Sequence, residues 1–590
     1  MRSKSMTISP PDAESGPLDD ADPCWIQPLR RRAMRGAKSS KLLSLGAVLL
    51  IVAFADPNSV SGQDDRRRMA IRPQVLGMAS VDLRWGLPFK GEDFREDERV
   101  YWGRKIHSEG GVQKYGYDLG AMRYVSAEWK EFTGDGKDNN VWYIYGKPVY
   151  AMADGKVIAC WRNAPQNLKP GSGEGSWHPE LTKHEGNKSR IYGGGNGFWV
   201  EHADGTRVEY AHFQPGTVPA SLCPHNDQLL PTIINSPAVE EAWPYIRVPV
   251  DQQKTVKKGQ KLGLVGNSGT SSAPHLHIHR EEGGQAGTAK SGGTPVEMRF
   301  ASGLSVPRSN STGPWAEWKS FARKPIPPGP SLIWPSRTPG AEYARHGYPA
   351  DRFGALFQHL ADSGMWAEWL DFYTVGGKAF VNQVWRPAKG AWRAYFGLTA
   401  RSYQDVFDDN NAEQFHPVFV DSYNSGSLTR YAVIFVKNKP GFRARHGLTY
   451  DQHMAEMDGA AKAGMSAVNV SVVSTGNDWH YTVLYRKQPI GGWVVKSRLP
   501  EDRYQAEYNS QSQAGRQPIY LNAYVHQGKP YITAVFAQIQ TNGRKDRHGM
   551  SGSQYQSEYE RALKGGMFTR AVTSFDGARS RHRFAATWWK

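Results

Sequence analysis

Residues 266–279 read GNSGTSSAPHLHIH, a loop of small residues that leads into three histidines at alternate positions. Because side chains alternate between the two faces of a strand, His275, His277 and His279 would share one face, with aliphatic residues on the other. Three histidines on one face make a poor core, but neutral imidazole is the commonest zinc ligand. The pattern favours a metal site over a structural cluster of histidines.

The sequence before this loop is rich in short strands and turns. Residues 197–205, GFWVEHADG, predict a strand followed by an Asp-Gly turn, and VEYAH at 208–212 predicts a strand that ends at His212. The 590 residues include 62 Gly and 37 Pro, a composition that suits turn-rich β structure. We expect a domain of short strands and turns over about residues 84–300.

Four motifs follow one another through this predicted domain. They are Tyr117-Asp118, the segment GKPVYAMADG at 146–155, the strand end at His212, and the loop 266–277. In this order they resemble the lysostaphin or LytM-type zinc endopeptidases over the whole domain. No single motif is specific, but the combination is.

This resemblance implies a small, open antiparallel sheet domain that cuts peptide bonds in cell-wall peptidoglycan, often beside glycine. It also implies that Asp118 and His277 bind Zn²⁺, while His212 and His275 polarise the attacking water and stabilise the tetrahedral oxyanion. The chemistry agrees, because a zinc ion with three protein ligands and an open position lowers the pKa of bound water to about 7 and polarises a carbonyl. Two histidines outside the ligand set can then transfer protons and stabilise the oxyanion.

One position departs from the family pattern, in which the first zinc ligand is a histidine four residues before the aspartate. Lys114 stands there, and a protonated lysine has no lone pair to donate. The string QKYGYD at 113–118 resembles a subgroup of the family with a histidine several residues upstream, which here is His107. We predict that His107 replaces the missing ligand, because Gly110 and Gly111 permit a sharp return of the chain between it and Asp118.

Other assignments compete with this one. His279 shares a face with His277, but two residues along a strand place it about 6 to 7 Å away, which is long for two ligands of one zinc. If the site lacks a third ligand, the domain is an inactive peptidase-like module that binds the wall or activates another protein. A further alternative places the function in the second half of the chain, as an adhesion or scaffolding array.

The second half of the chain is periodic. Two mostly aromatic series recur about every fifty residues: Phe353, Tyr403, His453, Tyr504 and Tyr555, and Trp385, Phe435, Tyr485, Phe536 and Trp588. The spacings are 50, 50, 51 and 51 residues in the first series and 50, 50, 51 and 52 in the second. We therefore expect five copies of one unit over about residues 341–590.

Each copy predicts a helix followed by a β-hairpin. Thr449 and Ser551 are each followed three residues later by glutamine, the capping-box pattern of a helix start. Two alternating runs around a Gly-containing turn come next, as in IYLNAYVHQGKPYITAVF at 519–536. Such a unit cannot bury its own apolar face, so the copies must pack side by side into a solenoid or a propeller-like ring.

The triplet Arg-His-Gly recurs at 345–347, 445–447 and 547–549. A metal site of three histidines is one interpretation, but one structural role repeated in each copy is favoured. The units resemble the bacterial tandem repeats in the non-catalytic region of polyglycine hydrolases. The β-lactamase-like catalytic part of those enzymes is not expected, because no Ser-x-x-Lys motif occurs in the chain. The resemblance implies a platform for binding or spacing.

Residues 301–340 separate the two halves and contain the proline-rich strings KPIPPGP and WPSRTPG. Prolines suppress regular structure and stiffen the backbone, so we expect a linker. The chain is then a β-rich multidomain protein, with an antiparallel peptidase-like sheet domain followed by an α+β repeat array.

The N-terminus has the layout of a signal peptide. Residues 42–55, LLSLGAVLLIVAFA, carry no charge, follow a stretch with six basic residues and end in a small-x-small triplet. They are fewer than the about twenty apolar residues that span a bilayer. We predict a signal peptide at 1–55, with Met34 as an alternative start, a linker at 56–83, and a secreted protein with no membrane span after cleavage.

The formal net charge of +17 suits anionic partners, which for an exported protein are wall polymers or membrane surfaces. No recognition motif for nucleic acid accompanies the charge, so nucleic acid is not predicted as a partner. Cys160 and Cys223 would remain after signal cleavage, and the sequence leaves open whether they form a disulfide. Together these patterns predict a secreted zinc metalloendopeptidase of peptidoglycan that is held on its target by repeats.

Overall fold

The structure is a computed structural model of the full chain, and it describes residues 85–103, 111–172, 175–179, 193–226, 246–283, 293–488, 490–577 and 581–590. The predicted signal peptide, the segment 56–83 and His107 lie outside these residues. All described residues belong to one compact unit of the chain.

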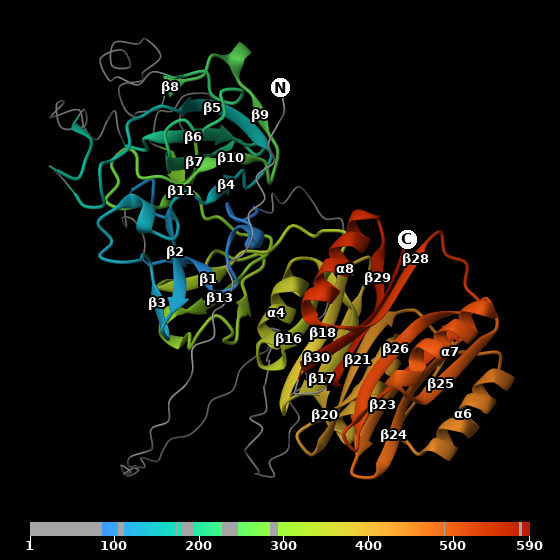
Figure 1. Cartoon of the computed structure of the whole chain (residues 1–590). Helices are drawn as coiled ribbons and strands as arrows, with labels where there is room; N and C mark the ends of the chain where they lie inside the picture. Colours follow the sequence, from blue (N-terminus) through green and yellow to red (C-terminus); the bar gives the residue numbers. More distant parts are fainter. Residues whose placement is uncertain are drawn as a thin grey trace, which may run out of the picture. The chain divides into compact units, whose positions relative to one another are not determined.

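The first half of the described chain is an antiparallel β-sheet domain, as predicted (Figure 1). The order of strands in the large sheet is β14–β13–β15–β1–β2–β11–β7–β6–β5–β8, with β3, β9 and β12 added at its sides and a separate pair, β4 and β10. The strands are β1 (Glu98–Trp102), β2 (Tyr117–Val125), β3 (Glu128–Lys130), β4 (Pro148–Tyr150), β5 (Gly155–Trp161), β6 (Asn196–Glu201), β7 (Thr206–Phe213), β8 (Ile246–Arg247), β9 (Thr255–Val256), β10 (Lys261–Leu264), β11 (Leu276–Glu282), β12 (Thr294–Pro295), β13 (Leu304–Pro307), β14 (Lys319–Ser320) and β15 (Ser331–Trp334).

Strand β11 shows why the sheet takes this register. Leu276 and Ile278 are fully buried in the hydrophobic core, which they share with Tyr210 of β7. A shift of one residue would move this apolar pair to the opposite face, so the register is strongly specified. The same register places His277 between Ala211 of β7 and Asp118 of β2.

The segment 301–340 is not the simple linker that its prolines suggest. It supplies three strands to the large sheet, and β15 pairs with both β1 and β13. Its strands are two to four residues long, and its prolines lie outside the strands except for Pro307, which ends β13. Proline is tolerated at such positions because no central ladder hydrogen bond is lost there.

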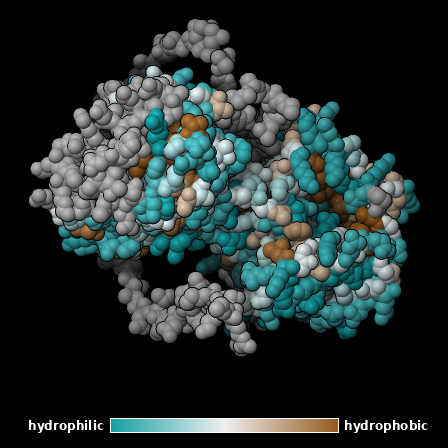
Figure 2. Space-filling model, turned by 90° about the horizontal axis from the view of Figure 1, so that it is seen from above, coloured by the Kyte–Doolittle hydropathy of each residue, from teal (hydrophilic) through white to brown (hydrophobic). Residues whose placement is uncertain are grey.

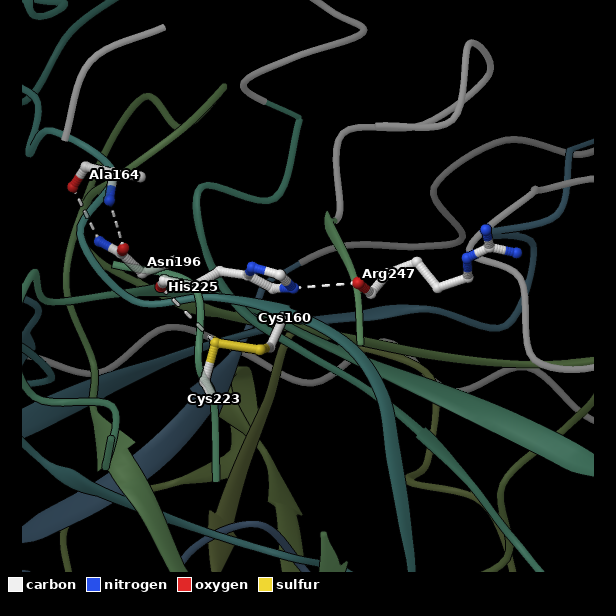
Figure 3. Close-up of a disulfide and its surroundings, with 6 residues drawn as sticks. All are labelled: Cys160, Ala164, Asn196, Cys223, His225 and Arg247. Atoms are coloured by element: carbon white, nitrogen blue, oxygen red, sulfur yellow. Dashed lines mark hydrogen bonds between the residues drawn. A yellow bond between two sulfur atoms is a disulfide. The ribbon is translucent and has the colours of Figure 1, made fainter. Parts of the chain in front are cut away.

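A disulfide joins Cys160 of β5 to Cys223, which lies in the loop after β7 (Figure 3). The two Cα atoms are 5.8 Å apart, and both side chains are fully buried. Beside it, Asn196 exchanges side-chain hydrogen bonds with both backbone groups of Ala164 (Figure 3). The disulfide therefore fixes the outer part of the sheet domain, on the side of β5 and β6.

The second half consists of five units with one design, strand–helix–hairpin (Figure 1). The first unit contains β16 (Tyr343–Pro349), α4 (Ala350–Asp362), β17 (Met365–Val375) and β18 (Lys378–Pro387). The next two contain β19 (Trp392–Leu398), α5 (Ala400–Ala412), β20 (Phe415–Ser425) and β21 (Leu428–Lys437), then β22 (Phe442–Leu448), α6 (Tyr450–Lys462), β23 (Ser466–Thr475) and β24 (Asp478–Arg486). The last two contain β25 (Trp493–Pro500), α7 (Glu501–Gln513), β26 (Gln517–His526) and β27 (Lys529–Ala537), then β28 (Arg544–Met550), α8 (Gly552–Lys564), β29 (Phe568–Gly577) and β30 (Arg581–Trp589).

The helix and hairpin of each unit were predicted, and capping boxes are present at Thr449 and Ser551. The strand before each helix was not predicted. In the first unit it carries the Arg-His-Gly triplet and pairs with the outer hairpin strand, with a register shift between Arg345 and Tyr348. This shift, with Gly347 at a φ of 59°, breaks the alternation by which a strand is recognised.

The five units close into a ring. The inner hairpin strands β17, β20, β23, β26 and β29 contact one another in turn, and β29 also contacts β17. One buried polar position repeats in all five strands, at Asp371, Asp421, Ser471, Asn522 and Thr573. In the first four units, the backbone N–H of the following residue donates to this side chain in the next unit, at 2.8 to 3.0 Å. The Thr573 hydroxyl donates to Asp371 at 2.9 Å, which joins the last unit to the first.

The histidines of the Arg-His-Gly triplets have the structural role that was favoured. His446 packs against Tyr403 in the helix of the preceding unit, at 5.0 Å between ring centroids, and His548 packs against Tyr504 at 5.1 Å. His346 belongs to the first unit and packs against Tyr555 of the last, at 4.4 Å. Each histidine therefore seals an interface between neighbouring units, including the one that closes the ring.

The surface of the described residues is mostly hydrophilic on the face seen in Figure 2, with small hydrophobic patches. Among these residues, the large exposed hydrophobic side chains are scattered over both halves: Leu168, Val250, Leu428, Tyr450 and Met454. Across the described part of the chain, each helix falls short of the length and apolar character that crossing a bilayer requires.

Candidate metal centre and active site

Three adjacent strands bring the predicted site residues together. Asp118 lies on β2, His212 on β7 and His277 on β11, and His275 immediately precedes β11. Nδ1 of His277 is 2.9 Å and Nε2 of His275 is 3.4 Å from Oδ1 of Asp118. The ring of His212 lies 4.6 Å from that of His275 and 6.2 Å from that of His277, between centroids. Four of the five predicted site residues therefore converge, and the fifth, His107, lies outside the described residues.

His212 is held in one orientation by its backbone and by its ring. Its φ is 70°, a left-handed conformation that a non-glycine residue adopts only where the surroundings enforce it. Its N–H donates to the carbonyl of Gly194 at 2.7 Å. Its Nδ1 lies 2.8 Å from the carbonyl oxygen of Ser268, and because a carbonyl only accepts, Nδ1 carries the hydrogen and Nε2 the lone pair.

The protonation state of His212 follows from its burial. Burial, together with the neighbouring rings of His275 and His277, lowers the pKa of His212 to about 3. The imidazole is therefore neutral at physiological pH, and its Nε2 lone pair is free to accept a proton from a group in the site. A neutral imidazole can act as a general base, whereas a permanently protonated one could not accept a proton.

His275 is also oriented by a carbonyl of the loop before β11. Its Nδ1 lies 2.8 Å from the carbonyl oxygen of Ala273, so the hydrogen is on Nδ1 and Nε2 faces Asp118. The side chains of His275 and Asp118 are 20% and 28% exposed, whereas those of His212 and His277 are almost completely buried. A substrate can thus reach the site from the side of His275 and Asp118.

A network of buried asparagines fixes the loop that carries these carbonyls. Asn167 donates from Nδ2 to the carbonyls of Gly269 and Ser271, at 3.0 and 2.9 Å. Asn267 donates to the side chain of Asn139, which in turn donates to the carbonyl of Asn167, both at 2.8 Å. These residues were not predicted, because their contacts join segments 28 to 128 residues apart for which no local pattern exists.

The donor set at Asp118 and His277 fits a metal ion. Burial lowers the pKa of His277, although the hydrogen bond with Asp118 opposes this effect, and a neutral imidazole has the lone pair that a metal needs. A carboxylate oxygen and an imidazole nitrogen 2.9 Å apart are close enough to share one ion. Lys114 stands at the position of the family's first ligand, and its ammonium group lies 5.4 Å from the ring centroid of the neighbouring Tyr115.

A second set of donors lies deeper, and here the distance predicted for His279 was wrong. Nδ1 of His279 is only 3.0 Å from Nε2 of His277, because the two rings lean towards each other along the strand. Donor atoms of His277, His279 and Glu209 all lie within 4.8 Å of one another, and all three residues are buried. Distance therefore does not exclude His279 from the metal centre, and Glu209 is a further candidate donor that was not identified from the sequence.

Comparison with known families assigns the second half of the chain. Five consecutive segments match the family model of the polyglycine hydrolase-like structural repeat, at residues 339–388, 389–438, 439–488, 490–539 and 545–590. These five units are polyglycine hydrolase-like repeats. Their boundaries agree with the strand–helix–hairpin units, so the polyglycine hydrolase-like repeat includes the strand before the helix.

Solved structures similar to the chain include three bacterial peptidases. They are the catalytic domain of lysostaphin from Staphylococcus simulans (20% identity, 33% of this chain and 86% of that chain, TM-score 0.15), a catalytic-domain mutant of the prophage-encoded M23 protein EnpA from Enterococcus faecalis (16%, 35% and 91%, 0.16), and a zinc-containing peptidase from Vibrio cholerae (16%, 28% and 46%, 0.11). Among curated proteins, none matches the chain. With TM-scores this low, the functional conclusion rests on the residues of the site.

Proposed function

We propose that the chain is a secreted zinc-dependent endopeptidase that hydrolyses peptide bonds of cell-wall peptidoglycan, with the polyglycine hydrolase-like repeats as a binding platform. The observation that carries this proposal is the convergence of Asp118, His212, His275 and His277, in which two histidines outside the ligand pair are each oriented by a backbone carbonyl. A purely structural cluster would not need this orientation, whereas peptide hydrolysis needs both a base and an oxyanion donor.

The residues present divide the work between them. A zinc ion bound here would supply an acidified water and a Lewis acid for the scissile carbonyl. Asp118 and His277 would hold the ion. Nε2 of His212 accepts the proton of the attacking water and returns it to the leaving amine. His275 donates from Nε2 to the developing oxyanion when its ring is protonated, with Asp118, 3.4 Å away, as the carboxylate that pairs with that ring.

The test of this proposal is the release of new amino termini from purified, cross-linked peptidoglycan. We expect wild-type protein to release them and His212→Ala to release none, because the variant keeps the metal ligands but lacks the base. Lysis without new amino termini would point to a bond other than a peptide bond and would contradict the proposal.

A second function, an inactive wall-binding or activating module, is favoured by one observation, which is Lys114 at the position of the first ligand. The two functions differ in the expected role of His107. If His107 is the third ligand, His107→Ala should reduce zinc occupancy as severely as Asp118→Ala, because two ligands bind zinc weakly. Lys114→Ala should leave about one zinc per chain, because lysine supplies no lone pair. Zinc content after gel filtration, measured by atomic emission, distinguishes the active enzyme from the inactive module.

If Asp118→Ala lost the metal but His107→Ala retained it, His107 would not be a ligand and the third donor would be His279 or Glu209. If none of the four proteins, including wild type, bound zinc, the inactive module would be the correct function.

A further inference from the structure

His279, which the mechanism above does not use, lies directly behind the metal ligand His277. Its Nδ1 is 3.0 Å from Nε2 of His277 and 3.0 Å from Oε2 of Glu209. His279 is 1% exposed and Glu209 is 3% exposed. A row of buried polar groups therefore runs inward from Asp118 through His277 to His279 and Glu209.

The sheet fixes this row. His279 and Glu209 are directly opposite each other on β11 and β7, and Glu281 and Arg207 form the next pair on the same face. Trp199 of β6 stands edge-on to the ring of His279, at 5.2 Å between centroids, and is fully buried. The imidazole of His279 is thus held in place by packing as well as by its hydrogen bond with His277.

The position of one hydrogen atom decides whether His277 can bind a metal through the nitrogen beside Asp118. A neutral imidazole carries one ring hydrogen, so Nδ1 offers a lone pair only when the hydrogen is on Nε2. Metal-binding histidines usually donate this second N–H to a partner, which fixes both the tautomer and the orientation of the ring. In this chain, the atom that faces Nε2 of His277 is Nδ1 of His279.

We infer that His279 is a positioning residue of the metal centre. Its Nδ1 accepts the hydrogen of His277 Nε2 and so holds His277 with its Nδ1 lone pair towards Asp118. This inference rests on the proposed function, since it takes His277 to be a metal ligand. A ring nitrogen carries either a hydrogen or a lone pair, so Nδ1 of His279 can donate to Glu209 or accept from His277, but not both at once. The metal-binding arrangement is the one in which it accepts from His277.

The experiment measures the zinc dissociation constant by competition with a chromophoric chelator. His279→Leu removes the acceptor at similar volume and should weaken zinc binding by about ten- to a hundredfold, the usual effect of losing such a partner. His279→Asn should restore most of the affinity, because its side-chain oxygen can accept a hydrogen bond at nearly the reach of Nδ1.

Glu281→Gln is the matched control. Glu281 is fully buried, lies two residues further along β11 and forms an ion pair with Arg207. Its loss should lower the thermal unfolding midpoint, because it leaves a buried guanidinium without its charged partner. Zinc affinity should be unchanged, because Glu281 does not touch His277. A variant that is only destabilised is thereby distinguished from one that loses the orientation of the ligand.

Two outcomes would overturn the inference while the proposed function stands. Wild-type affinity in His279→Leu would show that the contact does not position the ligand. Complete loss of zinc in both His279→Leu and His279→Asn, equal to the loss in Asp118→Ala, would show that His279 is itself a ligand. If the wild-type protein bound no zinc, the proposed function would fail, and the inference with it.

Discussion

His277→Ala should lose zinc and hydrolysis together, whereas His212→Ala and His275→Ala should lose hydrolysis and keep zinc. The reason is geometric. Nδ1 of His277 faces the carboxylate of Asp118, while His212 and His275 are tied through Nδ1 to backbone carbonyls and present only Nε2 to the site. Loss of a general acid or base costs about 10²- to 10⁴-fold in rate, so we expect falls of at least this size.

The measurements are zinc content and the initial rate of peptide hydrolysis for each purified variant. His202→Ala is the matched control. His202 is a buried histidine of the same domain, and its Nδ1 lies 2.8 Å from the carbonyl oxygen of Asp154, away from the site. The His202→Ala variant should keep both zinc and activity, even if its thermal unfolding midpoint falls. Equal zinc loss in the His212, His275 and His277 variants would overturn this division of roles.

Removing the last polyglycine hydrolase-like repeat should destabilise the array by more than the contacts within that repeat account for. A chain that ends at Gly543 lacks β28 to β30 and α8. The first repeat then loses its closing contacts, among them the hydrogen bond from Trp369 Nε1 to the carbonyl of Val572, the bond from Thr573 to Asp371, and the packing of His346 on Tyr555. Removing one repeat from a ring exposes the interface faces of both neighbouring repeats, whereas removing an end repeat from an open array exposes only one such face.

The expected result is a fall of more than about 10 °C in the unfolding midpoint of the array, since about 1 kcal/mol corresponds to 2 to 4 °C for a unit of this size. Differential scanning calorimetry of the full and the shortened chain measures it. Leu428→Ala, at an exposed hairpin position of the second repeat, should unfold like the full chain. An unchanged midpoint after deletion would show that the repeats are not coupled into a ring.

The features of the repeats that were predicted are those that a local pattern records. Period, helix and hairpin follow from aromatic spacing, capping boxes and alternation. The strand before each helix was missed because Arg345, His346 and Gly347 are polar and carry a register shift, so their sequence does not alternate. Closure of the ring depends on contacts between residues about 200 positions apart, such as Asp371 and Thr573. The segment 301–340 was assigned as a linker because of its prolines, and its strands of two to four residues leave too few positions to show alternation.

The residues of the site also fall into those that a local motif predicts and those that depend on contacts between distant segments. Asp118, His212, His275 and His277 each belong to a local motif, and the structure brings all four together. The error over His279 came from treating the strand rise as the distance between side chains, although two rings can lean together and bring their nitrogens to 3.0 Å. Glu209 was missed because its role depends on the pairing of β7 with β11, which the sequence of β7 does not reveal.

The central claim, a zinc-dependent peptidase, is tested most directly by measuring metal content and peptidoglycan hydrolysis on the same preparation, before and after removal of the metal. The account predicts about one zinc per chain, as in peptidases with a single catalytic ion. It also predicts that a chelator removes zinc and hydrolysis in parallel, and that added zinc restores both. Full hydrolysis by the metal-free chain, or bound zinc with no release of amino termini from any peptidoglycan, would contradict it.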